Sequence, residues 1–139
     1  MDLLKDKLAL VTGAGGGLGA AIAQGFAREG AKVIVADIDA ARAASVAQMI
    51  TDHGGQAWSE VLDVTDREGV RQFAQAVTER LGPIDILVNN AGVSGRASMD
   101  DPQAPEVWDR IMAVNLEGLF NVTHAFVPAL KASRGCIVN

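Results

Sequence analysis

Between a predicted strand and a predicted helix lies the stretch Thr12-Gly13-Ala14-Gly15-Gly16-Gly17-Leu18-Gly19. Its glycines permit a tight turn, let backbone N–H groups approach a pyrophosphate, and let the helix pack closely on the strand. The free N–H groups and the partial positive charge at the start of the helix stabilise phosphate without a lysine. We therefore predict the phosphate loop of a dinucleotide site, whose cofactor-binding residues include Gly13, Gly16, Gly17, Leu18 and Gly19.

Glycine spacing alone is a weak signal, because residues 15–20 also fit the dinucleotide pattern GxGxxA in a second register. The context is more specific, since a strand precedes the loop, a helix follows it, and an acidic residue ends the next strand. A P-loop nucleotidase is disfavoured because no Gly-Lys-Ser or Gly-Lys-Thr follows the loop. The alternative that stays open is a loop that only turns the chain.

The acidic residue is Asp37, which closes the run Val33-Ile34-Val35-Ala36-Asp37. A carboxylate at that place can accept hydrogen bonds from the ribose hydroxyls of adenosine and would repel a 2′-phosphate. No basic residue stands at Gly16 or Ile38 to neutralise such a phosphate. These features favour NAD over NADP as the cofactor; the alternative is that Asp37 or Asp39 caps the following helix.

The rest of the chain alternates β-branched runs with helical segments, which is the pattern of a parallel sheet covered by helices on both faces. The predicted strands are Lys7–Thr12, Lys32–Ala36, Gln56–Leu62, Asp85–Asn89 and Gly135–Asn139. Because strand-helix-strand units close right-handed, we expect an α/β fold with a doubly wound parallel sheet, a Rossmann fold, in strand order 3-2-1-4-5. Residues 1–139 then form one NAD-binding Rossmann domain that is truncated within its fifth strand, with catalytic and substrate segments outside it.

Helical spacing of apolar residues is clearest between residues 70 and 81. The stretch Thr65-Asp66-Arg67-Glu68 predicts a capping box, in which Thr65 accepts from a backbone N–H group and Glu68 reaches back. Gly82-Pro83 ends this helix because proline cannot continue the hydrogen-bond ladder. Two further helical segments are expected, one from about Pro105 and one with the apolar stripe Leu119, Phe120, Thr123, Val127 and Leu130.

Composition excludes several classes of protein. With a net charge of -5, a pI near 4.9 and no basic run, neither nucleic acid nor an anionic membrane is an expected partner. No apolar run approaches the roughly 18 residues of a membrane helix, and the N-terminus shows no secretory pattern, so we expect a cytoplasmic protein. Cys136 is the only cysteine and is expected to be a small buried hydrophobe, and no Cys or His cluster has metal-ligand spacing.

Four motifs in order make the sequence resemble the N-terminal half of a short-chain dehydrogenase/reductase, of the compact type that works as an oligomer. The matches run from Lys7 to Asn139. The family's glycine motif TGxxxGxG corresponds to Thr12, Gly13, Gly17 and Gly19, and its fourth-strand motif corresponds to Asn89-Asn90-Ala91-Gly92. Its acid after the third strand corresponds to Asp63 in Leu62-Asp63-Val64, and the helix asparagine of its catalytic set corresponds to Asn115.

The resemblance implies a role for each of these residues. Asp63 approaches the adenine of the cofactor, the adjacent Val64 belongs to the same cofactor-binding set, and Asn90-Ala91-Gly92 borders the cofactor at the carboxyl end of a central strand. Asn115 distorts its helix so that its main-chain carbonyl can hold a water in a proton relay. Plainer roles stay open: backbone hydrogen bonds for Asp63, a polar turn for residues 90–92, and a core or cap position for Asn115.

In the resembled family a tyrosine is the catalytic base, a lysine four residues later lowers the pKa of that tyrosine, and a serine holds the substrate oxygen. This chain has no tyrosine, and Ser133 precedes the fifth strand, at the wrong end of the sheet. The resemblance implies a parent NAD-dependent oxidoreductase that transfers hydride between nicotinamide and a secondary alcohol or ketone, while these 139 residues alone cannot turn over. It also implies a homo-oligomer, a dimer or a tetramer.

Two other classes of function stay open. A methyltransferase also uses a glycine loop and an acid after the second strand, although the glycine spacing and Asn89-Asn90-Ala91-Gly92 disfavour it. A non-catalytic dinucleotide-binding or regulatory module is the second class. His53 and His124 are interpreted as structural residues, because neither neighbours a plausible catalytic triad in the sequence.

Overall fold

The computed structural model describes residues 2–139 as alternating strands and helices. The strands are β1 (Leu8–Thr12), β2 (Lys32–Asp37), β3 (Gln56–Val61), β4 (Ile86–Val88) and β5 (Cys136–Val138). The helices are α1 (Gly17–Arg28), α2 (Ala40–Asp52), α3 (Arg67–Leu81), α4 (Ala104–Met112) and α5 (Leu119–Ser133), with the π-helical turn η1 (Ala113–Gly118) between the last two. Among the described residues, no helix has both the length and the apolar composition needed to cross a bilayer.

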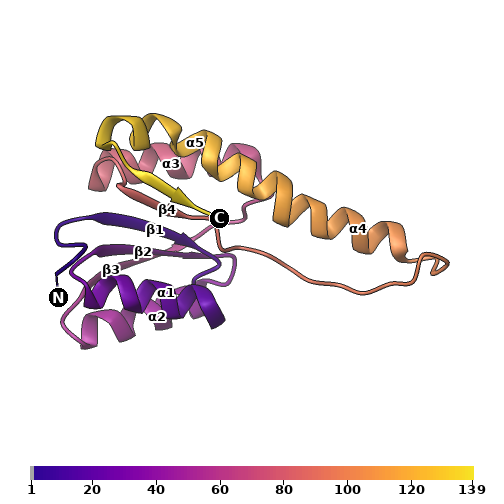
Figure 1. The fold of residues 1–139 in the computed structure, drawn as a ribbon, viewed down its shortest axis with the longest axis horizontal. Coiled ribbons are helices and arrows are strands. Elements are labelled where there is room, and N and C mark those ends of the chain that lie inside the picture. Colours follow the sequence, from indigo (N-terminus) through magenta and orange to yellow (C-terminus); the bar gives the residue numbers. More distant parts are fainter. Residues whose placement is uncertain (1) are drawn as a thin grey trace.

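The five strands form one parallel sheet in the order β3-β2-β1-β4-β5. Helices α1 and α2 cover one face of this sheet, and α3 and α5 cover the other (Figure 1). The predicted doubly wound topology and strand order are therefore confirmed. The order reverses between β1 and β4, which is the place where open α/β sheets bind ligands at the carboxyl ends of their strands.

Alternation along the central strands divides the core into two layers. Leu8, Leu10 and Ile34 point to the face covered by α3 and α5, where Phe126 is the largest fully buried side chain. The intervening strand residues Ala9, Val11, Val33 and Val35 pack against the small side chains of α1 and α2. Because both faces of β1 and β2 are buried, these strands read as continuous apolar runs in the sequence.

Helix α3 begins one residue later than the predicted capping box requires. Its N-cap is Asp66, whose side chain accepts from the N–H of Gly69 at 3.0 Å. Thr65 lies before the cap, where its own N–H and hydroxyl both donate to Oδ1 of Asp63, at 2.9 and 2.7 Å. Glu68 instead bonds forward to Arg71 and Gln72, so the predicted reciprocal box is wrong. The predicted end at Gly82 is confirmed, with φ of 88° at that residue.

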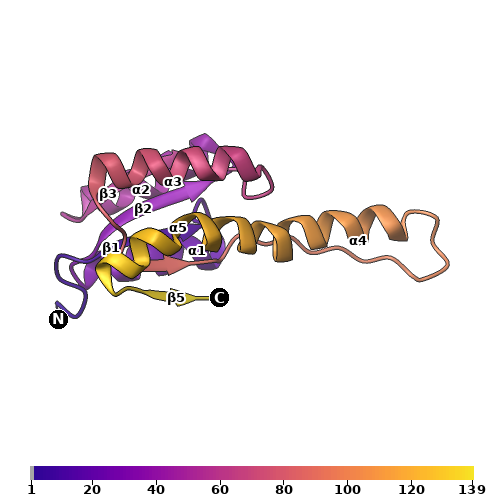
Figure 2. The same ribbon diagram turned by 90° about the horizontal axis from the view of Figure 1, so that it is seen from above.

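The last two predicted helical segments join into a single rod. Helix α4, η1 and α5 run on without a break, and α4 projects beyond the sheet together with the loop that precedes it (Figures 1 and 2). The π-helical turn falls on residues 113–118, where Asn115 was expected to disturb the helix. The rod therefore runs along the sheet and extends past the carboxyl ends of its strands (Figures 1 and 2).

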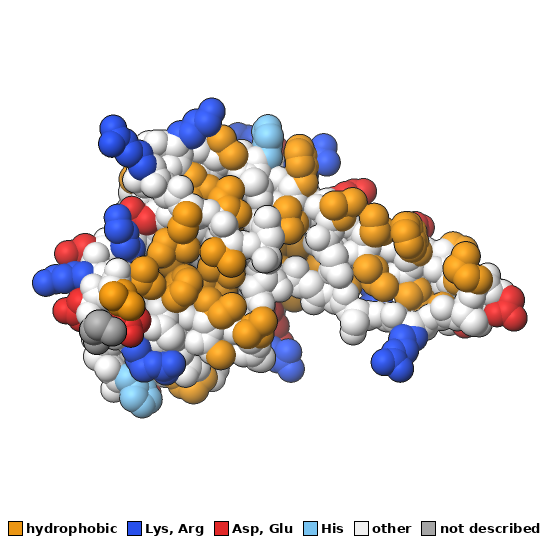
Figure 3. Space-filling model, viewed as in Figure 1, with side chains coloured by type: hydrophobic (Ala, Val, Ile, Leu, Met, Phe, Trp, Pro, Cys, Tyr) orange, Lys and Arg blue, Asp and Glu red, His pale blue; other side chains and the backbone are white. Residues whose placement is uncertain are grey.

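Strand β5 forms the outer edge of the sheet, next to β4. Hydrophobic side chains gather on the face of the molecule that carries this edge (Figure 3), and the exposed ones include Ile137 and Val138. Cys136 is exposed, which contradicts the expectation of a buried hydrophobe. The reason is its place on an edge strand, since the sequence of a strand does not state which of its faces a neighbour covers.

Candidate functional site

A cleft of about 720 Å³ opens at the carboxyl ends of the first four strands. Its walls are the loops that follow β1, β2, β3 and β4, together with one residue of η1. The lining residues are Gly13, Gly15, Gly16, Gly17, Asp37, Ile38, Arg42, Leu62, Asp63, Val64, Asn90, Ala91, Gly92, Val93 and Val114. All predicted site residues except Leu18, Gly19 and Asn115 therefore line one cavity at the topological switch point.

The loop after β1 presents backbone N–H groups with no side chain in front of them. Gly16 is the N-cap of α1 and makes no side-chain cap hydrogen bond, and the first turn of α1 holds no acidic residue. By contrast, Asp39 caps α2 and Asp66 caps α3. A Cβ on Gly16 or Gly17 would meet no atom within 4 Å, so the space over the helix N-terminus is open. This arrangement fits a diphosphate, which would accept from the uncapped amides.

Two residues of the predicted loop, Leu18 and Gly19, do not line the cleft. Leu18 is exposed at the surface of α1, outside the cleft lining. Gly19 is buried, and a Cβ there would collide with the side-chain amide of Asn90 and the carbonyl of Gly13. Gly19 thus lets helix α1 approach the end of β4, which is the packing role of a glycine in this kind of loop.

Reciprocal hydrogen bonds connect the phosphate loop to the residues that follow β4. The hydroxyl oxygen of buried Thr12 accepts from the N–H groups of Asn90 and Ala91, at 3.1 and 3.0 Å. In return, Nδ2 of Asn90 donates to the carbonyls of Thr12 and Gly13, at 3.0 Å each. The Asn90 amide therefore holds the loop, and Thr12 is a positioning residue that sequence reasoning had quoted only as part of a motif.

The carboxylate of Asp37 stands beside the phosphate loop at the end of β2. Its Oδ2 accepts from the N–H of Gly15 at 2.8 Å, and its Oδ1 accepts from the N–H of Asp39 at 3.0 Å. Asp39, and not Asp37, caps α2 by accepting from the N–H of Arg42 at 3.0 Å. Each oxygen of an ionised carboxylate has a second lone pair, so the partly exposed Asp37 can still accept from a ribose hydroxyl.

Arg42 lines the same end of the cleft, and sequence reasoning missed it. Its Nε lies 3.9 Å from Oδ2 of Asp39, and its side chain is largely exposed. The expectation of NAD rested on Gly16 and Ile38, neither of which is basic, whereas Arg42 brings a cation to the same cleft. Its position in the sequence offered a signal. Arg42 lies in the first turn of α2, the helix that follows β2, and is therefore close to the end of β2.

The loop after β3 forms the opposite wall with Asp63 and Val64. Asp63 uses Oδ1 for the two bonds from Thr65, so the local backbone role that stayed open for it is present. It also lines the cleft, and its two roles are compatible. Val64 is buried against Gly118, where a Cβ would lie 2.5 Å from Cγ2 of Val64.

Asn115 occupies the middle of the π-helical turn but does not line the cleft. Its side chain bonds the backbone of Val93, and the neighbouring Val114 is the residue of η1 that reaches the cavity. The helix is therefore distorted where the resemblance implied. The part of Asn115 in a proton relay stays a prediction.

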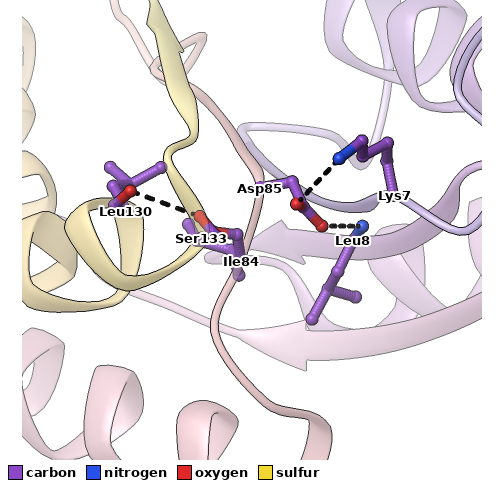
Figure 4. Close-up of polar contacts among 6 residues, drawn as sticks. All are labelled: Lys7, Leu8, Ile84, Asp85, Leu130 and Ser133. Atoms are coloured by element: carbon purple, nitrogen blue, oxygen red, sulfur yellow. Dashed lines mark hydrogen bonds and ion pairs between the residues drawn. The ribbon is translucent and has the colours of Figure 1, made fainter.

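Three other residues weighed in the sequence lie away from the cleft. Nδ1 of His53 bonds the carbonyl of Met49 at 2.7 Å, and the ring of His124 stacks on Phe120 with centroids 5.6 Å apart. Ser133 donates to the carbonyl of Ile84 at 2.7 Å, before β4 begins, which is the end of the sheet opposite the cleft (Figure 4). Nearby, Asp85 accepts from the N–H of Leu8 at 2.9 Å and pairs with Lys7 (Figure 4).

Comparison with known proteins identifies relatives along the whole chain. The chain is 40% identical over 139 residues to the uncharacterized oxidoreductase YxbG of Bacillus subtilis, covering 100% of this chain and 51% of that protein. It is 40% identical over 137 residues to the 3-oxoacyl-[acyl-carrier-protein] reductase FabG of Thermotoga maritima, covering 98% of this chain and 55% of that protein. The crystal structure of a hydroxysteroid dehydrogenase from Escherichia coli superimposes with a TM-score of 0.88 at 37% identity, covering 96% of this chain and 57% of that one.

The chain thus spans about half the length of the curated relatives that it matches. Proteins of the family to which these similarities point bind a nicotinamide dinucleotide. The open phosphate loop and the carboxylate of Asp37 beside it agree with such a cofactor. The model of the short chain dehydrogenases matches residues 7–139, which is nearly the whole sequence. From this match and from the shared fold, the chain belongs to the short chain dehydrogenase family.

Proposed function

We propose that the polypeptide carrying this chain is an NAD-dependent oxidoreductase, and that these residues supply its cofactor-binding half. The observation that supports this proposal is that the uncapped N-terminus of α1 and the carboxylate of Asp37 lie on the same wall of one cleft. The amides would hold the diphosphate, and Asp37 would accept from the adenosine ribose. The nicotinamide, when bound, supplies the hydride chemistry.

The preference for NAD over NADP rests on the charge of Asp37. A 2′-phosphate placed beside this carboxylate would meet a like charge, whereas the ribose hydroxyl of NAD would meet an acceptor. Arg42 is the basic residue of the cleft lining, and its side chain is paired with the carboxylate of Asp39. We infer that Asp37 outweighs Arg42, because Asp37 is fixed by two backbone N–H groups while Arg42 is largely exposed.

The substrate that we propose is a secondary alcohol or its ketone. One relative is named as a reductase of a 3-oxoacyl group, and a similar structure is named as a dehydrogenase of a hydroxysteroid. An alcohol-ketone pair is the chemistry that these two names share. The chain holds no tyrosine to act as the base expected in this family, so we expect residues 1–139 to bind cofactor without turning over alcohol.

We also propose that the protein is a homo-oligomer that joins through the projecting rod. Trp108, Leu116 and Phe120 are 64%, 55% and 54% exposed, which leaves large apolar side chains of the rod in contact with water. Sedimentation equilibrium tests this proposal. We expect a dimer or tetramer, and replacement of these three residues by serine should give a monomer; an unchanged assembly would contradict it.

Isothermal titration calorimetry with NAD, NADP and S-adenosylmethionine tests the cofactor proposal. We expect NAD to bind best, NADP to bind more weakly, and S-adenosylmethionine not to bind. Preference for S-adenosylmethionine would identify a methyltransferase instead. An assay of alcohol oxidation then separates an enzyme from a binding module, and alcohol oxidation by the 139 residues alone would contradict the assignment of the base to other residues.

A further inference from the structure

Two of the described polar residues are buried as a whole, and both lie next to residues that line the cleft. Within residues 2–139, the buried polar side chains are Thr12 and Asn121, which are 2% and 5% exposed. A buried polar group is costly unless hydrogen bonds compensate it, so such a group marks a position where a particular geometry is held. Thr12 holds the ends of β1 and β4 together.

Asn121 connects the first turn of α5 to the loop between β3 and α3. Its Nδ2 donates to the buried carbonyl of Val64 at 3.0 Å, and its Oδ1 accepts from Nε of Arg67 at 3.0 Å. The guanidinium of Arg67 also lies over the ring of Phe120, 5.9 Å from its centroid. Both polar ends of the Asn121 amide are thus satisfied by a segment 54 to 57 residues away in sequence.

The neighbouring turn η1 packs against the side chain of Val64. Gly118 packs so closely on it that a Cβ would lie 2.5 Å from Cγ2 of Val64. Val64 and the adjacent Asp63 line the cleft, whereas Asn121 does not. The backbone and the side chain of one wall residue are therefore both fixed from η1 and α5.

We propose that Asn121 is a positioning residue for the dinucleotide, acting through the backbone of Val64. This inference rests on the proposed function, because it assigns the ligand of the cleft. Asn121 keeps the wall formed by Asp63 and Val64 at a fixed distance from the phosphate loop, which Thr12 fixes on the other side. The two buried polar side chains thus set the width of the cofactor site before the cofactor binds.

The test compares two variants with different hydrogen-bonding capacity, made in the full natural polypeptide. Asn121→Leu keeps the approximate volume and removes both hydrogen bonds, whereas Asn121→Asp keeps an acceptor for Arg67 and removes the donor to Val64. We expect Kd for NAD to rise roughly tenfold in both, with kcat at saturating NAD within about twofold of the unsubstituted protein. Hydrogen exchange at residues 63–66 should accelerate in both variants without cofactor.

Ser133→Ala is the matched control. Ser133 also donates to a backbone carbonyl, that of Ile84 at 2.7 Å, but at the opposite end of the sheet (Figure 4). This variant should lower Tm while leaving Kd for NAD unchanged. Asn121 variants that lower Tm without changing Kd would show a merely structural role and overturn the inference. If the unsubstituted protein does not bind NAD, the proposed function itself is wrong, and this result is distinct from an unchanged Kd in the Asn121 variants. If Asn121→Leu does not fold, the Kd of Asn121→Asp for NAD decides.

Discussion

The side-chain amide of Asn115 pairs with the backbone of Val93 through two hydrogen bonds. Nδ2 of Asn115 donates to the carbonyl of Val93 at 2.9 Å, and the N–H of Val93 donates to Oδ1 of Asn115 at 2.8 Å. The amide therefore acts as a neighbouring strand would, at a point where β4 has already ended. It attaches the loop that borders the cleft to the π-helical turn of the rod.

Replacing Asn115 by leucine should loosen this loop. Both bonds are lost, at a cost of about 1 to 2 kcal/mol in the free energy of unfolding, given that the pair is solvent-accessible. Urea unfolding measures this loss, and hydrogen exchange at Val93 should accelerate. Glu117→Gln, on the same exposed turn, is the control and should leave both measurements unchanged; equal effects of the two substitutions would contradict the pairing.

Much of the fold could be predicted because it follows from local patterns. Strands buried on both faces produce apolar runs, and right-handed crossovers leave few strand orders to consider. The start of α3 could not be placed to the residue, because Thr65 and Asp66 are both residue types that cap helices, and only the folded loop shows that Asp66 accepts from the N–H of Gly69. The exposure of Cys136 likewise depends on which elements cover the edge of the sheet.

The candidate site divides in the same way. Residues carried by a motif, such as Gly13 and Asp37, could be predicted from their sequence context, and both line the cleft. Thr12 and Asn121 act through partners more than 50 residues away in the chain, so spacing alone does not reveal them. Tertiary hydrogen bonds of this kind become visible only when the loops are placed in space.

Gly13 and Gly17 should respond differently to substitution by alanine. Both have positive φ, 62° and 53°, and an alanine in that region costs roughly 1 to 2 kcal/mol. At Gly13 the added Cβ would also lie 2.8 Å from the backbone Cα of Ala91, while at Gly17 it would meet nothing within 4 Å. We expect Gly13→Ala to lower the free energy of unfolding more than Gly17→Ala does. Equal losses in urea unfolding would mean that the close approach to Ala91 is not maintained.

Glu68 provides a test of acid stability. Its bonds to Arg71, and then to Gln72, lower the pKa of this carboxyl from 4.5 to about 2. Because the pKa in the folded state lies below the unfolded value, the ionised group stabilises the protein above pH 4.5, and this contribution is lost as pH falls toward 2. Glu68→Gln should therefore lower Tm at neutral pH, with the difference from the unsubstituted protein shrinking through that window. Glu79→Gln serves as a control on the same helix, and a difference that grows in acid would contradict the pKa direction.

Asp37 should control affinity for NAD. Removing its carboxylate in Asp37→Ala should weaken NAD binding by about 1.5 to 3 kcal/mol, the scale of charge-assisted hydrogen bonds, with less effect on NADP. Calorimetry measures both affinities. Asp39→Ala is the control, because it removes the cap of α2 and should cost about 1 kcal/mol of stability without a comparable change in NAD affinity. Equal losses for NAD and NADP in Asp37→Ala would contradict the assignment of Asp37 to the ribose.

Arg42 becomes decisive for cofactor choice once the carboxylate of Asp37 is gone. In Asp37→Ser, the like charge that opposes a 2′-phosphate is absent, and Arg42 is the basic residue of the cleft lining. Because a guanidinium binds phosphate through charge-assisted hydrogen bonds, we expect NADP affinity to rise in this variant, and adding Arg42→Ala should remove roughly 1.5 to 3 kcal/mol of that binding. NAD lacks the 2′-phosphate, so its affinity should differ little between the single and the double variant. A rise in NADP affinity that survives Arg42→Ala would mean that another cation receives the phosphate, and that Asp39 keeps Arg42 away from it.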